Sequence, residues 1–346
     1  MNTLTENVSK PTPFIFVVGN SRSGTTMMGR IMGNHPDIYF LNELHFFEQL
    51  ATAEELEKYV SDDQAKALLM RLFTIQHDGF FHQGDPRRYH ENAEIVMKAM
   101  QKNQLYPLAV FKTFLLHECE QAGKKYPCVH TPRNVFYLKE ILALIPEARI
   151  INMIRDPRDV LLSQKRRWKR RFLGNKHIPL KQVVRYWVNY HPITISKLWN
   201  ASVRAADFHQ DHPHVFHLHF EELVVHPQEK IKQLCEFIGV DYHENMENVP
   251  QIGSSSGADN REQKFIDPKV AGRWKSGGLK KIEIALCEKI TREKMIAHGY
   301  QPSGAKISPI SFLGTFLAFP LKLIVAFFLN LHRMKSIIET LKRRLM

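Results

Sequence analysis

The chain has 346 residues, of which 44% are hydrophobic and 24% charged, the balance of an ordinary globular protein. These fractions exclude a disordered or collagen-like chain, and the length allows one large or two modest domains with a substantial core. Because 48 lysines and arginines outweigh 35 acidic residues, the net charge is +13, which predicts an anionic partner such as a nucleotide, an acidic glycan, a nucleic acid or a membrane surface.

The first 13 residues are polar and contain two prolines, and we expect a loose arm there. This stretch lacks the basic and then apolar order of a signal peptide. The four cysteines form no C-x-x-C pair, which indicates reduced core thiols in a cytoplasmic protein. Because no N-terminal anchor is seen, we also expect a bacterial source.

Short apolar runs predict three buried strands, at residues 14–18, 148–154 and 215–220. Between the first two, residues 46–120 indicate mostly helices. Strands that alternate with helices predict a three-layer α/β fold around a central parallel sheet, with a helical insertion. The remaining predicted elements are helices over residues 26–34, 135–144 and 227–238 and from about Arg158, an irregular stretch over residues 79–88, and a flexible loop over residues 251–260.

The segment FIFVVGNSRSGTTMMGRIM, residues 14–32, has the strand, glycine-containing loop and helix of a phosphate-binding P-loop. Its glycines allow a tight turn in which backbone N–H groups converge on an anion at the start of the helix. The spacing is that of Walker A, but Thr25 stands at the lysine position and Thr26 at the Ser/Thr position. Without the lysine, a kinase or NTPase loses the cation that holds its β- and γ-phosphates. Arg22, inside the loop, can supply positive charge to a 5′-phosphate instead.

A segment that reads RSGTT between a strand and a helix resembles the 5′-phosphosulfate loop of sulfotransferases that use 3′-phosphoadenosine-5′-phosphosulfate (PAPS). The resemblance covers about residues 14–300 and is closest to the membrane-associated, carbohydrate- and tyrosine-modifying type and its bacterial relatives. It implies one sulfotransferase domain over residues 14–300, PAPS as cosubstrate and no metal. The residues assigned in this way to the 5′-phosphosulfate are Ser21, Arg22, Ser23, Gly24, Thr25 and Thr26.

This family also carries a strand followed by an arginine and, about eight residues later, a serine, both on the 3′-phosphate. Residues 148–163, ARIINMIRDPRDVLLS, supply Arg155 at the strand end and Ser163 in the following helix. An arginine fork and a hydroxyl suit a phosphate, although the same residues also suit an ordinary strand-to-helix turn. A Walker B strand ends in aspartate, so Arg155 again disfavours a metal-dependent NTPase.

Transfer to a hydroxyl needs a base for the departing proton. Relatives with RSGTT place a glutamate about 20 residues after the loop, and Glu43 follows the apolar stretch 38–41 here. We predict Glu43 as the general base; a glutamate on the surface of a helix over residues 42–50 is the structural alternative, and His45 is a second candidate. Where relatives show Lys-Thr-Pro, this chain has His130-Thr131-Pro132. His130 is expected to stabilise the leaving oxygen, to act as a second base, or only to precede a helix.

Three other polar segments invite functional interpretations. VAGRWKSGG resembles the family's late loop over the cofactor, which implies 3′-phosphate contacts for Arg273 and Lys275 and stacking on the adenine for Trp274. The histidines of DHPHVFHLHFEE, residues 211–222, have no third ligand at a recognised zinc spacing, so no metal is expected. The basic run KRRWKRR, residues 165–171, either attracts an anionic acceptor, binds nucleic acid, or is a solvated helix face.

The tail, residues 301–346, carries seven basic residues and one acidic residue, nearly half of the net charge. Residues 307–331 are strongly apolar, but Pro320 and Lys322 interrupt a clean transmembrane span. With the basic amphipathic segment that follows, the pattern predicts attachment of residues 305–346 to an anionic membrane surface. A true span and a buried or oligomerising helix pair are the alternatives.

Together these patterns predict a PAPS-dependent sulfotransferase, cytoplasmic and peripheral or monotopic at the membrane. The expected reaction is in-line transfer of the sulfuryl group to a hydroxyl of a glycan or lipid-linked acceptor, with Glu43 as base; the lipid-linked acceptor rests on location alone. The alternatives are a P-loop kinase or NTPase and a non-catalytic basic adaptor for a membrane or nucleic acid. No nucleic-acid partner is expected, and the pattern predicts no particular oligomeric state.

Overall fold

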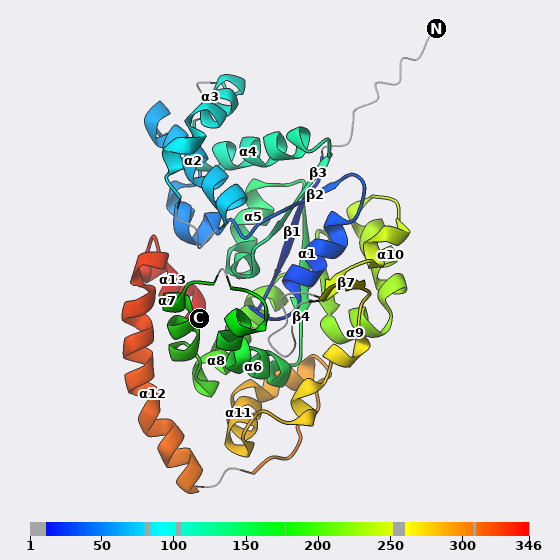
Figure 1. The fold of residues 1–346 in the computed structure, drawn as a ribbon, viewed down its shortest axis with the longest axis vertical. Helices are drawn as coiled ribbons and strands as arrows, with labels where there is room; N and C mark the ends of the chain where they lie inside the picture. The colour runs from blue at the N-terminus through cyan, green and yellow to red at the C-terminus, as the bar shows by residue number, and fades with distance from the viewer. Residues whose placement is uncertain are drawn as a thin grey trace.

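The computed structural model describes residues 12–79, 84–101, 105–176, 178–251, 260–306 and 309–345. The arm expected over residues 1–13 lies almost entirely outside these ranges, as does most of the loop expected over residues 251–260. The described elements surround a central sheet, and one long helix runs along the outside (Figure 1).

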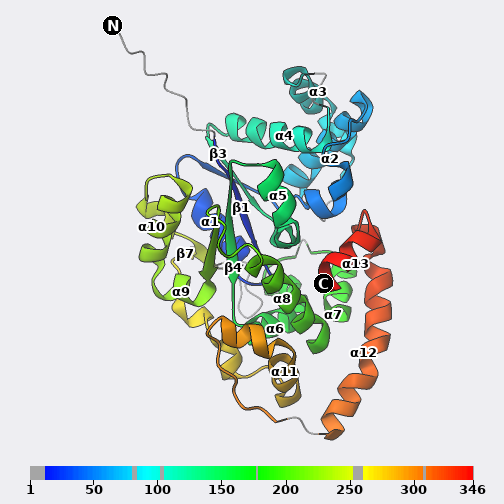
Figure 2. The ribbon, with the colours of Figure 1, turned by 180° about the vertical axis from the view of Figure 1, so that it is seen from behind.

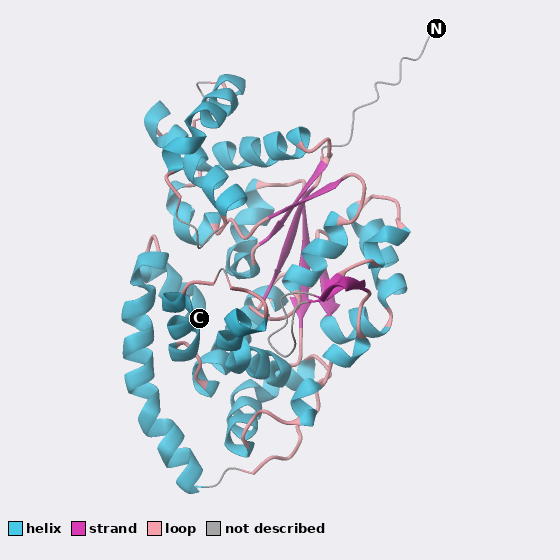
Figure 3. Cartoon of the chain, in the orientation of Figure 1, coloured by secondary structure: helices cyan, strands magenta, loops and turns pink. Residues whose placement is uncertain are grey.

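Five parallel strands form the central sheet, in the order β2-β3-β1-β4-β5. The carboxyl ends of the five strands therefore meet at one edge (Figure 3). Their bounds are Phe14–Gly19 for β1, Ile38–Leu41 for β2, Tyr126–His130 for β3, Ala148–Ile154 for β4 and Val215–His219 for β5. A short antiparallel pair, β6 (Pro250–Gln251) and β7 (Asn260–Lys264), lies apart from it.

Helices fill the connections between the strands and most of the C-terminal part of the chain (Figure 2). The insertion between β2 and β3 consists of α2, α3 and α4, as the helical pattern of residues 46–120 predicts. The helix bounds are Thr25–Gly33 (α1), Asp62–Asp78 (α2), His90–Ala99 (α3), Pro107–Gln121 (α4), Leu138–Leu144 (α5), Pro157–Arg166 (α6), Leu180–Val188 (α7), Pro192–Asp207 (α8), Phe220–Val225 (α9), Pro227–Ile238 (α10), Lys281–Ala297 (α11), Pro309–Asn330 (α12) and Ile337–Leu345 (α13).

The residues of β1 alternate between two hydrophobic cores. Phe14, Phe16 and Val18 pack with the side of the molecule that carries α4 and α5, whereas Ile15 and Val17 pack with α1, α9 and α10. Helices thus cover both faces of the sheet, and the predicted three-layer α/β fold is confirmed. Because the helices that follow β1 and β3 lie on opposite faces, a crevice forms between the carboxyl ends of these strands, the usual ligand site of such sheets.

Strands β1, β4 and β5 lie where the sequence pattern predicts strands, whereas β2 and β3 were not predicted. Both are short, with four and five residues, and β3 includes Pro127, so neither shows a clear strand pattern. The helix expected over residues 42–50 is a π-helical turn over Phe46–Leu50. The helix expected over residues 135–144 is divided between a 3₁₀ helix, Pro132–Tyr137, and α5.

The C-terminal tail returns to the body of the protein. Helix α12 packs along α7, and α13 packs against α8. Arg343 pairs with Glu140 of α5 at 2.5 Å, Arg344 pairs with Glu48, and Lys335 pairs with Glu55 at 2.7 Å. Residues 331–345 are therefore held against the three-layer body, whereas α12 contacts α7 on one side and keeps many apolar side chains exposed.

Candidate active site

The phosphate loop joins β1 to α1 at the carboxyl edge of the sheet. Gly19 and Gly24 have φ values of +136° and +94°, which favour glycine, and a Cβ on Gly24 would lie 2.3 Å from the Phe220 ring. No side chain caps α1 among the described residues, so its first backbone N–H groups remain available for an anion. The Ser23 hydroxyl is buried without a hydrogen-bond partner in the same described ranges. A phosphate or sulfate oxygen fits both features.

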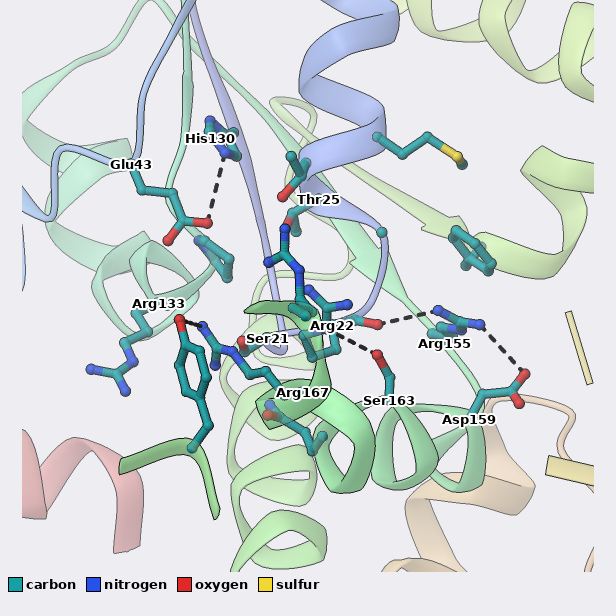
Figure 4. Close-up of a pocket in the computed structure, with 18 of the residues that line it drawn as sticks. Ser21, Arg22, Thr25, Glu43, His130, Arg133, Arg155, Asp159, Ser163 and Arg167 are labelled. Atoms are coloured by element: carbon teal, nitrogen blue, oxygen red, sulfur yellow. Dashed lines mark hydrogen bonds and ion pairs between the residues drawn. The ribbon is translucent and has the colours of Figure 1, made fainter. Parts of the chain in front are cut away.

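Arg155 extends from the carboxyl end of β4 to this loop (Figure 4). Its guanidinium donates to the carbonyl oxygens of Arg22 at 3.4 Å and Val270 at 2.7 Å. It also stacks on Phe220, with 4.1 Å between the guanidinium carbon and the ring centroid. Arg22 in turn donates from Nε to the Ser163 hydroxyl at 2.9 Å. The structure therefore brings together the residues predicted at the two ends of one nucleotide.

The two arginines carry charge that burial makes costly. Burial, followed by the positive charges of Arg170, Arg167 and Arg155, lowers the pKa of Arg22 to about 9. Burial likewise lowers the pKa of Arg155, against the attraction of Asp159, which lies 3.7 Å away. A bound anion would stabilise both guanidinium groups. The Nε of Arg155, buried and without a hydrogen-bond partner in the part of the chain that the structure describes, is a donor suited to such an anion.

Glu43 lies after β2, on the other side of the phosphate loop from Arg155 (Figure 4). Its carboxylate is 3.4 Å from His45 Nε2 and 3.7 Å from His130 Nε2. Burial alone would raise the pKa of Glu43, but the hydrogen bond from His45 and the charges of His130 and His45 outweigh it and lower the pKa to about 2. The side chain is still 39% exposed, so an ionised carboxylate faces the cavity.

His130 lies next to Glu43 in the cavity (Figure 4). Its Nδ1 is 2.9 Å from the Leu41 carbonyl oxygen, which can only accept, so the ring proton sits on Nδ1 and Nε2 faces Glu43. Burial lowers the pKa of His130, against the attraction of Glu43. At 3.7 Å, Nε2 makes no hydrogen bond to the Glu43 carboxylate, and His130 attracts Glu43 only when the ring is protonated. Its expected roles at the leaving oxygen and as a second base stay predictions.

One cavity of about 460 Å³ joins the phosphate loop, Arg155 and Glu43. Each of the five parallel strands is followed by a residue or segment that lines this cavity. Among the described residues that line it are eight arginines and two carboxylates, a strongly cationic balance. The arginines are Arg22, Arg30, Arg133, Arg155, Arg167, Arg170, Arg273 and Arg333, and the carboxylates are Glu43 and Asp159.

Five of these eight arginines received no individual role from the sequence, among them Arg133, Arg167 and Arg333. Arg133 follows β3 and pairs with Glu48 at 2.8 Å; its position just after His130-Thr131-Pro132 was an available signal. Arg167 belongs to the basic run 165–171, for which an anionic acceptor was one interpretation. Arg333 comes from the C-terminal tail, and no local pattern distinguishes it from the other basic residues there.

The late loop lies against the cavity, and part of it lines the cavity. Arg273 lines the cavity. Trp274 does not face it: the Arg158 guanidinium covers the ring at 3.9 Å, and the indole nitrogen donates to Asp156 at 3.2 Å. Lys275 is exposed and lies outside the cavity lining. The adenine stacking expected of Trp274 and the 3′-phosphate contact expected of Lys275 stay predictions, and the described contacts of Trp274 are with Arg158 and Asp156 of the RDPRD turn.

Other reactive groups lie away from this site. The four cysteine thiols are buried. His217 contacts Asn152 at 3.1 Å, and the His219 ring lies beside Tyr300. In the described part of the chain, no group of three or more histidine, cysteine or acidic side chains is arranged to hold a metal ion.

Comparison with known proteins gives one family. The family model described as "Sulfotransferase family" matches residues 13–244. A protein-tyrosine sulfotransferase 1 of Danio rerio is 23% identical over 252 residues, which make up 72% of this chain. The match covers 59% of the zebrafish protein, less than two thirds of its length.

Two solved structures have similar chains at low identity. The sulfotransferase domain from the Synechococcus PCC 7002 olefin synthase is 22% identical, with a TM-score of 0.46, and the match covers 82% of this chain and 95% of that one. The sulfotransferase domain from the curacin biosynthetic pathway is 18% identical, with a TM-score of 0.49, and the match covers 85% of this chain and 99% of that one.

Proposed function

The chain belongs to the sulfotransferase family, and on this premise we propose that it moves the sulfuryl group of PAPS to a hydroxyl of an acceptor, with Glu43 as the general base. The observation that carries the proposal is the cavity that joins the phosphate loop, Arg155 and Glu43. An anion site at each end of a nucleotide and an ionised carboxylate beside them are the groups that this reaction requires.

The proposed PAPS site has two halves. The backbone N–H groups at the start of α1, with Arg22, Thr25 and Thr26, hold the 5′-phosphosulfate. Arg155, Ser163 and Arg273 hold the 3′-phosphate. The hydrogen bond between Arg22 and Ser163 supports this division, because it keeps the two halves adjacent.

In the proposed reaction PAPS supplies an activated sulfuryl group, and this chain's residues supply the base, the charge and the alignment. The acceptor oxygen attacks sulfur in line with the bridging oxygen; one sulfur–oxygen bond forms while the bond to the 5′-phosphate breaks. The electron pair of the broken bond stays on adenosine 3′,5′-bisphosphate, beside Arg22, and the acceptor proton passes to Glu43. The low pKa of Glu43 keeps its carboxylate ionised at neutral pH, the protonation state that a general base requires.

Titration calorimetry with nucleotides tests the proposal. Adenosine 3′,5′-bisphosphate is expected to bind at least about tenfold more tightly than adenosine 5′-phosphate, because a charge-assisted contact contributes about 1.5–3 kcal/mol. EDTA should leave this affinity unchanged, since no metal takes part. Tighter binding of ATP, and only with Mg²⁺, would instead identify a kinase or NTPase.

The acceptor is proposed to be a glycan or lipid-linked hydroxyl at the cytoplasmic surface of a membrane. Among the described helices, Phe312–Asn330 is the one long and apolar enough to cross a membrane, with a mean hydropathy of 2.1 and no buried share. Leu317, Leu321 and Phe328 are 67%, 68% and 65% exposed. Such a surface is unfavourable in water and suits the acyl region of a bilayer.

The side of α12 that contacts the protein supports attachment of this helix along the membrane surface rather than a transmembrane orientation. Lys322, the charge in the middle of the apolar run, donates to the Tyr190 carbonyl oxygen at 3.2 Å and lies over the Trp187 ring. His191 reaches the Thr315 carbonyl oxygen at 3.1 Å. One side of the helix therefore faces protein, which leaves the other for lipid.

Sedimentation with vesicles of anionic phospholipid tests the membrane proposal. The full chain should sediment, and the double variant Leu317→Glu/Leu321→Glu should stay in the supernatant, because two charges would enter the acyl region. A matched control, Tyr59→Glu/Ile95→Glu, changes two other exposed hydrophobic residues, 67% and 56% exposed, in the helical insertion and should still sediment. Equal sedimentation of both variants would contradict attachment through α12.

A further inference from the structure

The cavity carries more positive charge than the nucleotide needs. PAPS carries about four negative charges at neutral pH, since a phosphate monoester has nearly two. Arg22, Arg155 and Arg273 surround its proposed site, yet Arg133, Arg167 and Arg333 also line the cavity. Near these three, the described part of the cavity lining provides the carboxylate of Glu43, and Glu48, outside the lining, pairs with Arg133 at 2.8 Å. The surplus charge lies on the side where the acceptor must enter.

Helix α7 brings two of these arginines together. Arg333 donates to the Gln182 side-chain oxygen at 2.9 Å. Arg167 lies over the Tyr186 ring at 4.1 Å and points toward its hydroxyl. Residues four apart on a helix are neighbours, with Cβ atoms about 5–6 Å apart. The two guanidinium groups thus contact neutral side chains that lie one helical turn apart on α7.

Arg133 completes the group from the opposite side. It extends from the 3₁₀ helix after β3 and shares Glu48 with Arg344 of the tail. Burial and the positive charges of Arg185, Arg133 and Arg167 lower the pKa of Arg333 to about 10. Like charges that repel one another in this way are stabilised by an anion between them.

We propose that Arg133, Arg167 and Arg333 form a second anion subsite, and that the acceptor is a hydroxyl compound that also bears a phosphate or similar anionic group. This inference rests on the proposed sulfotransferase function and specifies its acceptor. The subsite lies on the Glu43 side of the cavity, so the anion orients the acceptor while its hydroxyl meets the base. Both a membrane headgroup and a free organophosphate have this chemistry.

The source of Arg333 gives the tail a second role. Asn330, the last residue of α12, also lines the cavity and donates to the Asn189 side-chain oxygen at 2.9 Å. The same segment that ends the exposed apolar helix therefore supplies a wall of the acceptor site. Removing residues 305–346 would abolish both membrane contact and the subsite, so point variants are needed to separate them.

Calorimetry on the full chain in non-ionic detergent, saturated with adenosine 3′,5′-bisphosphate, tests the subsite. sn-Glycerol 3-phosphate should bind saturably, and glycerol should not. Arg333→Gln and Arg167→Gln, on different elements, should each weaken glycerol 3-phosphate at least about tenfold and leave the adenosine bisphosphate affinity within about twofold. Lys335→Gln, two residues from Arg333 and paired with Glu55 outside the cavity, is the matched control and should change neither.

Vesicles distinguish the two sources of the anion. Tighter binding of phosphatidylglycerol than of glycerol 3-phosphate, with no binding of the uncharged monoglucosyl diacylglycerol, would support a membrane headgroup; similar affinities for the two phosphates would support a free one. Equal binding of charged and uncharged probes, no saturable binding of either phosphate, or full affinity in Arg333→Gln and Arg167→Gln would overturn the subsite. Failure to bind adenosine 3′,5′-bisphosphate would instead count against the sulfotransferase proposal itself.

Discussion

Replacing Glu43 by glutamine is expected to lower kcat for sulfuryl transfer by about 10²–10⁴-fold, the usual contribution of a general base. Glutamine has nearly the same shape but cannot accept the acceptor proton. The pKa of Glu43 is lowered to about 2, so its carboxylate becomes protonated only as the pH falls toward 2. Between pH 5 and 8 the wild-type residue stays ionised, and the loss in the variant should be nearly constant over that range.

The measurement is turnover of radiolabelled PAPS with an acceptor identified by screening lipid and glycan extracts. Affinity for adenosine 3′,5′-bisphosphate should change by less than about threefold, which separates lost chemistry from lost binding. Glu118→Gln is a matched control, because Glu118 also pairs with a histidine, His77, at 3.3 Å but lies outside the cavity lining. Near-normal kcat in Glu43→Gln would rule out this residue as the base.

Arg155→Lys is expected to remove most of the preference for a 3′-phosphate, with a loss of roughly 10- to 150-fold in affinity for adenosine 3′,5′-bisphosphate. Lysine keeps the charge but loses the planar fork. In the structure that fork donates to two carbonyl oxygens and stacks on Phe220, which fixes its direction. A lysine ammonium has no such support and is more strongly hydrated.

The comparison of adenosine 3′,5′-bisphosphate with adenosine 5′-phosphate is the informative readout. Affinity for the second nucleotide should change little in Arg155→Lys, because it lacks the 3′-phosphate. Arg149→Lys lies at the start of the same strand, at the opposite edge of the sheet, and should leave both affinities within about twofold. An equal loss for both nucleotides would mean that Arg155 supports the loop rather than the 3′-phosphate.

Motifs contiguous in the chain were predicted well. The strand, loop and helix around Gly19 and Gly24 form because consecutive residues carry both the apolar run and the turn, and Arg155 and Ser163 follow β4 in the same local way. Strands β2 and β3 escaped prediction because their few residues become strands only by pairing with one another and with β1. Trp274 contacts Arg158, which lies more than 100 residues earlier in the sequence, so no local pattern indicates this contact.

The sequence by itself determined the anion-binding loop, the replacement of the Walker lysine by Thr25, the α/β architecture and the apolar tail, because each depends on neighbouring residues or on periodicity. Only the tertiary structure decided which charges meet. Arg133, Arg167 and Arg333 reach one cavity through the ends of β3, α6 and α12, and Lys322 faces α7 rather than lipid. Long-range packing sets such positions, because the residues next to an arginine or lysine in the sequence do not indicate which cavity or helix its charged group will contact.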